Sequence, residues 1–170
     1  IVHDLAAAES VWRGLEGPKA SFTPYQRFDF LRPWQHEVGR REGLAPFIVI
    51  AFDADRQPLA LFPLALRNAY GARCASFMGG KHSTFNMALW NRDFAASATA
   101  TDLDGLIAAI SQRAEADVLA LHQQPARWRD LPNPLALLPH QPSANDCPLL
   151  VMAPGAALVS NSFRRRLKGK

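Results

Sequence analysis

Residues 46–66, PFIVIAFDADRQPLALFPLAL, contain two apolar runs separated by a short polar turn. Each run is continuous rather than alternating, which is typical of a strand that is buried on both faces. The intervening DADRQ has the composition of a hairpin connection. We therefore expect an antiparallel hairpin inside a sheet. Because Pro63 has no N–H to donate, we also expect a bulge or an unpaired stretch at that residue.

Two helices are expected before this hairpin. Asp4 is a suitable N-cap for a first helix, and the apolar positions that follow it at helical spacing are Leu5, Ala8, Val11, Trp12 and Leu15. A second helix is expected over roughly residues 30–41. Pro33 fits its first turn, where a missing N–H has no intrahelical partner to lose. Residues 21–26 indicate a short turn between the two helices.

Short strands and a third helix are expected after the hairpin. CASFM (residues 74–78), FNMALW (85–90), DVLALHQ (117–123, expected to be buried) and CPLLVM (147–152) are strand candidates. Thr101 and Asp104 form a capping-box-like start for a helix whose apolar stripe is Leu103, Leu106, Ile107, Ile110 and Ala114. The predicted fold class is therefore α/β (α+β), with a mixed, mostly antiparallel sheet flanked by helices.

The overall charge does not indicate a nucleic-acid-binding surface. The chain has 170 residues, the length of one ordinary domain, and a sequence pI of about 9.5. Up to Ser162 there are 14 basic and 15 acidic residues, so the positive excess is confined to the segment 163–170. We expect no DNA partner. No run of apolar residues is long enough for a membrane span.

The cysteines and histidines predict neither a disulfide nor a metal site. Cys74 and Cys147 each lie in an apolar, strand-like context, so we expect buried free thiols and a reducing, cytoplasmic compartment. The five histidines share no ligand spacing, and no Cys-x-x-Cys pair is present. A serine hydrolase has little support because the Gly-x-Ser-x-Gly motif is missing.

The segment SFMGGKHSTFN (residues 76–86) joins two of the strand candidates. It is not a P-loop, because His82 stands where serine or threonine is required and Ala75 where the first glycine is required. One interpretation is a glycine turn whose serine and asparagine side chains bond its own backbone. The other is a binding loop that presents His82, Ser83 and Asn86 from a rigid scaffold.

Five stretches, in this order, resemble the N-terminal half of the FemAB-like, CelD-like GNAT-fold acyltransferases, also called BioF-associated acetyltransferase-domain proteins. They are TPYQRFDFLRPW (23–34), QPLALFPLALR (57–67), FMGGKHSTFNMAL (77–89), ADVLALHQQP (116–125) and SFRRRLKGK (162–170). The resemblance implies a GNAT-like acceptor-side domain over residues 1–159. Over residues 160–170 it implies a basic helix start that leads into a second GNAT half. Phe85 stands where the family commonly has tyrosine.

The resemblance implies transfer of an acyl group from acyl-CoA to an amine on a small molecule or on an envelope or exopolysaccharide precursor. It places the acyl-CoA site in the second half, so this segment is expected to hold no cofactor and to be inactive alone. The expected acceptor contacts are Tyr25, Gln26, His82, Ser83 and Asn86, with Arg164 and Arg165 assisting an anionic acceptor. No catalytic base is assigned. Two alternatives remain: a Fem-type enzyme that uses aminoacyl-tRNA, and a non-catalytic binding module of the same fold.

Overall fold

The hairpin expected from residues 46–66 is present, and its second strand lies at the centre of the sheet. The computed structural model describes residues 1–144. In it, β2 (Ala45–Phe52) pairs antiparallel with β3 (Pro58–Ala69), and β4 (Ala72–Phe77) pairs antiparallel with β3. Between β3 and β4 the two-residue turn has φ 54° at Tyr70 and φ 80° at Gly71. Positive φ at both positions is typical of a tight hairpin turn.

A helical crossover makes the sheet mixed. Helix α4 (Ala100–Ser111) leads to β6 (Val118–Ala120), which pairs parallel with β4. The strand order is β1-β5-β3-β4-β6, with β2 on the opposite edge of β3. The remaining strands are β1 (Ala20–Ser21), β5 (Leu89–Asn91) and a separate two-stranded pair, β7 (Arg127–Trp128) and β8 (Leu131–Pro132). The mostly antiparallel sheet of the predicted fold class is confirmed.

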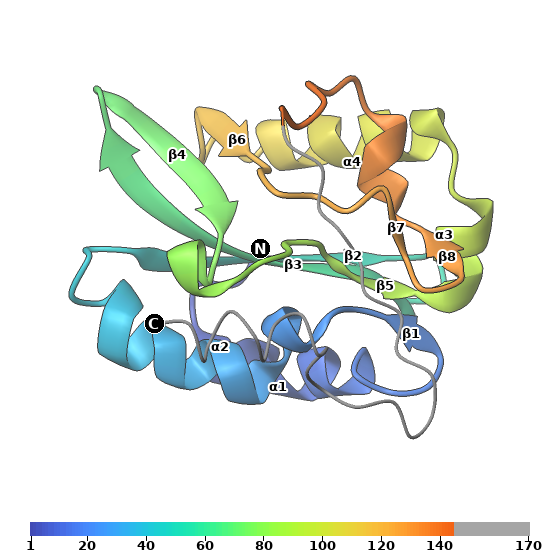
Figure 1. Cartoon of the computed structure of the whole chain (residues 1–170), viewed down its shortest axis with the longest axis horizontal. Coiled ribbons are helices and arrows are strands. Elements are labelled where there is room, and N and C mark those ends of the chain that lie inside the picture. The colour runs from blue at the N-terminus through green and yellow to red at the C-terminus, as the bar shows by residue number, and fades with distance from the viewer. Residues whose placement is uncertain (145–170) are drawn as a thin grey trace, which may run out of the picture.

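Helices cover both faces of this sheet (Figure 1). Helices α1 (Leu5–Gly14) and α2 (Phe28–Trp34), the latter continued by a π-helical turn at Gln35–Gly39, lie on one face. Helices α3 (Arg92–Ser97) and α4 lie on the other. Three short 3₁₀ segments complete the described residues: η1 (Pro24–Gln26), η3 (Gly80–His82) and η4 (Pro134–Leu137). None of the helices in residues 1–144 has the length and hydrophobicity needed to cross a bilayer.

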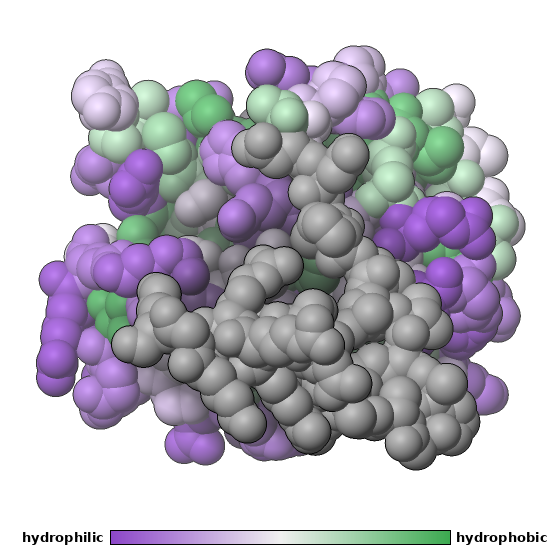
Figure 2. All heavy atoms as spheres, viewed as in Figure 1, coloured by the Kyte–Doolittle hydropathy of each residue, from purple (hydrophilic) through white to green (hydrophobic). Residues whose placement is uncertain are grey.

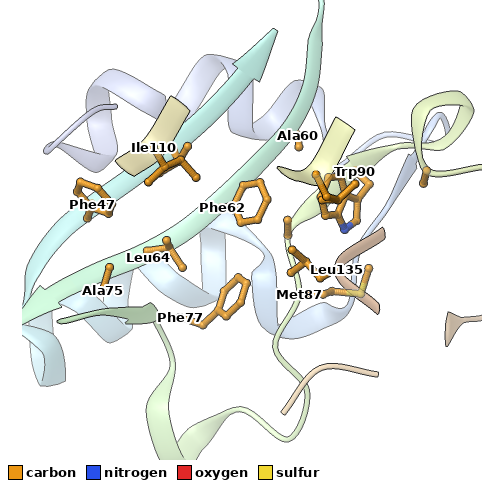
Figure 3. Packing of buried hydrophobic residues seen from close by; sticks show 14 residues of the cluster. Phe47, Ala60, Phe62, Leu64, Ala75, Phe77, Met87, Trp90, Ile110 and Leu135 are labelled. Atoms are coloured by element: carbon orange, nitrogen blue, oxygen red, sulfur yellow. The ribbon is translucent and has the colours of Figure 1, made fainter. Parts of the chain in front are cut away.

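The hairpin is buried on both faces, as its continuous apolar runs predict. Phe47 and Phe62 belong to the cluster under α3 and α4, whereas Ile48 and Leu61 belong to the cluster under α1 and α2. All four side chains are 1% exposed or less. Figure 3 shows the Phe62 ring on the strand between Leu64 and Ala60, close to Trp90. The sheet is therefore the middle layer of a three-layer core.

Strand β3 runs through Pro63 without a bulge. The register shift of the hairpin lies next to Ala51 instead. The Pro63 carbonyl accepts a hydrogen bond from Met78 N–H at 2.9 Å. Because N and O of a strand residue point to the same edge, the missing N–H also faces that edge. On that edge, β5 pairs with residues 60–61 of β3, and β4 pairs with β3 from Leu64 onward. The expected unpaired stretch is the part of this edge that lies between β5 and β4.

The second helix begins earlier than predicted. The N–H of Phe28 donates to the Glu16 carboxylate at 2.5 Å, and its ring packs edge-on against Trp12. These contacts fix the helix start at a residue that the apolar spacing did not include. Pro33 consequently lies near the end of α2 rather than in its first turn, so that prediction is wrong. The π-helical turn follows directly, where the proline interrupts normal helical bonding.

The third helix is confirmed, but its cap is not. Thr99, not Thr101, is the N-cap: its N–H donates to Asp102 Oδ2 at 2.8 Å, and its Oγ1 accepts from Asp102 N–H at 3.3 Å. Ala114, expected on the apolar stripe, lies beyond the last helical residue and has φ 52°. The helix therefore starts two residues earlier than the predicted capping box of Thr101 and Asp104, shortly after the end of α3.

Two strand candidates are shorter than expected. FNMALW is a strand only over its last two residues and Asn91. DVLALHQ is a strand only at β6, and Val118 is 45% exposed because β6 lies at the sheet edge, so the prediction of a buried strand is wrong. Cys74 is a free, half-buried thiol. The CPLLVM candidate, Cys147 and the basic segment 160–170 lie outside the described residues.

Candidate functional site

The candidate site lies at the carboxyl ends of the parallel pair β4 and β6. Because both strands run in the same direction, the segments that follow them leave the same end of the sheet, where ligands commonly bind in α/β proteins. The two segments are joined by hydrogen bonds. Asn86 N–H donates to the Gln123 carbonyl, and Asn86 Nδ2 donates to Gln123 Oε1, both at 3.1 Å. We call residues 79–86 the glycine loop.

Two glycines determine the course of this loop. Gly79 has φ 100° and Gly80 has φ 48°, conformations that residues with a side chain rarely adopt. A Cβ atom added at Gly79 would lie 2.0 Å from Ser83 Oγ. Ser83 therefore packs directly on the Gly79 backbone, and the loop closes as the 3₁₀ turn η3.

Three of the expected acceptor contacts form a buried frame beneath the loop. Gln26, Ser83 and Asn86 are each 5% exposed or less. Gln26 Nε2 donates to the Phe85 carbonyl at 3.0 Å, and Gln26 Oε1 accepts from Thr23 N–H and Oγ1–H at 3.1 and 2.6 Å. Gln26 thus holds the loop against η1, and Asn86 holds it against the segment after β6. Ser83 Oγ and Asn86 Oδ1 are buried and have no hydrogen-bond partner among the described residues. In this conformation the buried side chains of Gln26 and Asn86 support the loop.

The other expected contacts reach the surface. Tyr25 OH lies 3.1 Å from Thr84 Oγ1, and the Tyr25 ring packs edge-on against Phe30. His82 and Lys81 are exposed. The Thr84 hydroxyl, itself on the surface, holds Tyr25 OH, so this donor is fixed before a ligand arrives.

Trp34 fixes the orientation of His82. Trp34 is 7% exposed, and its Nε1–H donates to His82 Nδ1 at 3.1 Å. This contact joins α2 to η3 across 48 residues of sequence. It brings a third element, in addition to η1 and the segment after β6, to the glycine loop.

The loop also contacts the walls of two hollows. One, of about 400 Å³, lies beside η1 and is lined partly by Arg27, Arg92, Trp128 and Asp130. The Phe85 ring contacts the Trp128 ring at a centroid distance of 5.8 Å. Arg92 is paired with Asp130, and this guanidinium hydrogen bond holds the pKa of the carboxyl below its ordinary value. The hollow therefore combines aromatic walls with a fixed ion pair.

The second hollow is larger and more apolar. It has a volume of about 910 Å³ and lies between α4, β6 and η4, with Ile107, Leu119, Leu121, His122 and Leu135 in its wall. The glycine loop reaches this wall where Asn86 bonds Gln123. Figure 2 shows hydrophobic residues among hydrophilic ones in the upper part of the view, over α4.

The structure thus brings together five of the seven residues expected from the sequence. Tyr25, Gln26, His82, Ser83 and Asn86 all lie in or against the glycine loop, whereas Arg164 and Arg165 lie outside the described residues. Sequence reasoning missed Trp34, Thr84 and Gln123. A buried tryptophan in a helix signals packing, and its N–H partner is set by tertiary contacts that no local pattern reveals.

Searches against models of protein families, against curated protein sequences and against solved structures gave no match for this chain.

Proposed function

We propose that this chain forms the acceptor-side part of a GNAT-superfamily N-acyltransferase that transfers an acyl group from acyl-CoA to an amine. The observation that supports the proposal best is the glycine loop itself. It presents Lys81 and His82, with Tyr25 of η1 against it, above the buried side chains of Gln26 and Asn86 at the carboxyl ends of β4 and β6. The proposed acceptor is an amine of a small molecule or of an envelope or exopolysaccharide precursor.

The element order also supports this proposal. Two helices precede an antiparallel β2-β3-β4 meander, and α4 then crosses over to the parallel strand β6. This is the mixed, mostly antiparallel sheet with flanking helices that the acyltransferase resemblance implies. In the proposal, the acyl-CoA site belongs to a second GNAT half of the same protein.

The proposed chemistry divides between the two halves. Amine acyl transfer requires a base that removes a proton from the attacking nitrogen and donors that stabilise the oxyanion formed at the thioester carbon. In the proposal, this chain binds and orients the acceptor: Tyr25 OH and His82 hold its polar groups, and the aromatic walls beside Phe85 and Trp128 exclude water from it. We assign no base to residues 1–144.

Steady-state kinetics of the full-length protein that contains this sequence test the proposal. We expect CoA release from acetyl-CoA that depends on an added amine, measured with a thiol reagent over a panel that includes amino sugars. Tyr25→Phe should raise the KM for the amine about fivefold with little change in kcat, because a neutral hydrogen bond is worth about 1 kcal/mol.

Tyr70→Phe is the matched control. Tyr70 is fully exposed in the turn between β3 and β4, so the same loss of a hydroxyl should leave the kinetics unchanged. Amine-dependent acyl transfer that is equally insensitive to both substitutions would place the acceptor elsewhere. If the full-length protein releases CoA in the presence of none of the amines, and transfers an aminoacyl group to none of the acceptors, the proposed reaction is contradicted and a binding module is favoured.

A further inference from the structure

The contact between Trp34 and His82 determines which imidazole nitrogen carries the proton. An indole nitrogen only donates hydrogen bonds, so His82 Nδ1, 3.1 Å from Trp34 Nε1, must present a lone pair. In a neutral imidazole the proton then resides on Nε2. His82 is exposed while Trp34 is buried, so the Nε2–H is the part of the ring available to a ligand.

This tautomer makes His82 a donor rather than a base. A base would need an accessible nitrogen lone pair, and the lone pair of the neutral ring is already occupied by Trp34. The complementary group on a ligand is therefore an acceptor oxygen. Lys81, the preceding residue in η3, is also exposed and adds a cationic donor to the same turn.

The charges around the glycine loop are of both signs, but Lys81 forms no ion pair with a carboxylate among residues 1–144. Four segments meet at the glycine loop: residues 18–28, 30–36, 75–91 and 118–129. Together they contain six basic residues, Lys19, Arg27, Arg32, Lys81, Arg127 and Arg129. Six acidic residues lie within two positions of their ends, and one of these, Glu16, lies 3.6 Å from Arg27, so the unpaired cation next to His82 in the chain is Lys81. A ligand oxygen that approaches His82 is consequently favoured when it is negatively charged.

We propose that His82 and Lys81 bind an oxyanion of the ligand, a carboxylate or a phosphate, and that Trp34 is the positioning residue that keeps His82 as its hydrogen-bond donor. The inference deepens the proposed function, on which it rests for the view that this loop receives the acceptor. It names the acceptor's class: an amine that also carries an acidic group.

The tautomer is tested by ¹⁵N-resolved NMR of the imidazole rings in the full chain, at about pH 8 so that imidazoles are neutral. We expect His82 to show a protonated Nε2 and an unprotonated Nδ1. In Trp34→Phe, which keeps an aromatic ring but removes the N–H, we expect a mixture of both tautomers. A protonated Nδ1 in the unmodified chain, or no change in Trp34→Phe, would overturn the role of Trp34.

The anion site is tested by titrating the same sample with inorganic phosphate and, separately, with acetate. We expect saturable shifts of the His82 and Lys81 resonances with at least one probe, and the probe that binds identifies the acidic group. His36 is the internal control, because Glu37 Oε1 lies 2.7 Å from its Nδ1 and repels an added anion. His82→Leu should weaken binding about tenfold, since a charge-assisted hydrogen bond is lost.

His82→Gln provides the rescue. Its amide oxygen is able to accept from Trp34 while its NH₂ donates outward, so affinity should stay within about threefold of the unmodified chain. Equal weakening by leucine and glutamine, or shifts that grow linearly at all histidines, would refute the site. Acyl-transfer activity is not read in either experiment, so failure of the proposed reaction and failure of the anion site remain distinguishable.

Discussion

Gly79 is the residue on which the shape of the glycine loop depends. Its φ of 100° and the 2.0 Å approach of Ser83 Oγ to a Cβ position leave no room for a side chain. Backbone strain and steric overlap therefore act together at this one position.

We expect Gly79→Ala to lower the free energy of unfolding by about 3 kcal/mol, the sum of a left-handed alanine and an overlap with Ser83. Urea denaturation measures the change. Gly43→Ala is the matched control: Gly43 has φ 69° but nothing within 4 Å of its Cβ position. It should cost only the backbone term, about 1 kcal/mol. Equal costs at both glycines would show that Ser83 does not constrain the loop.

The sequence predicted which residues gather at this loop, but it did not predict which of their side chains are buried. Gln26, Ser83 and Asn86 are expected to touch the acceptor, and the burial of all three was not predictable from the sequence. A polar residue in a loop has the same local pattern whether it faces solvent or supports a turn. Trp34 illustrates the same limit, because its partner His82 is 48 residues away.

Among the elements, α4 shows most clearly how a start is selected. Thr99 and Asp102 form the observed capping box, while Thr101 and Asp104 have the same spacing inside the helix. The hydrogen bond that the Thr99 hydroxyl donates holds the pKa of Asp102 below its ordinary value.

We expect Thr99→Ala to destabilise the protein by about 1 kcal/mol, the typical cost of a lost N-cap, and Thr101→Ala to be nearly neutral. Thermal unfolding of the two variants compares identical substitutions two residues apart. A larger loss of stability in Thr101→Ala would show that Thr101 is the N-cap, as the sequence predicted.

The elements were predictable where the apolar period was long and unambiguous. The β2-β3 hairpin, α1 and the body of α4 follow their patterns. The first residues of the helices were less predictable. Two possible capping boxes with the same spacing lie at the start of α4, and the buried Phe28 makes α2 begin earlier than its apolar spacing indicates. The pairing of β6 with β4 was not predictable at all, because the sequence of a short strand does not specify its neighbour.

The stability of the whole fold at low pH depends on exposed carboxylates that form ion pairs between separate helices and strands. Arg73 at the start of β4 bonds Asp117, just before β6, and this hydrogen bond lowers the pKa of the carboxyl from 3.8. Arg13 has the same effect on Asp29, and Arg92 on Asp130. A carboxyl whose folded pKa is lowered stabilises the fold above its unfolded pKa, and this stabilisation is lost as the pH falls through the folded value.

We therefore expect the midpoint of thermal unfolding to be insensitive to pH near neutrality and to fall below about pH 4. Asp117→Asn should reduce the slope of this acid-side decrease, while Asp55→Asn, in the exposed turn between β2 and β3, should not. Differential scanning calorimetry over a pH series supplies the curves. Identical slopes for the two variants would remove Asp117 from this role.

The edge of β3 at Pro63 has one further consequence. Pro63 offers only its carbonyl there, and that carbonyl already accepts from Met78 N–H, so no further strand can pair with Pro63 between β4 and β5. The segment between β4 and β5 spans this notch, and the bond from Met78 N–H attaches its start to β3. A substitution after Met78 in this segment should therefore leave the pairing of β3 with β4 and β5 unaltered.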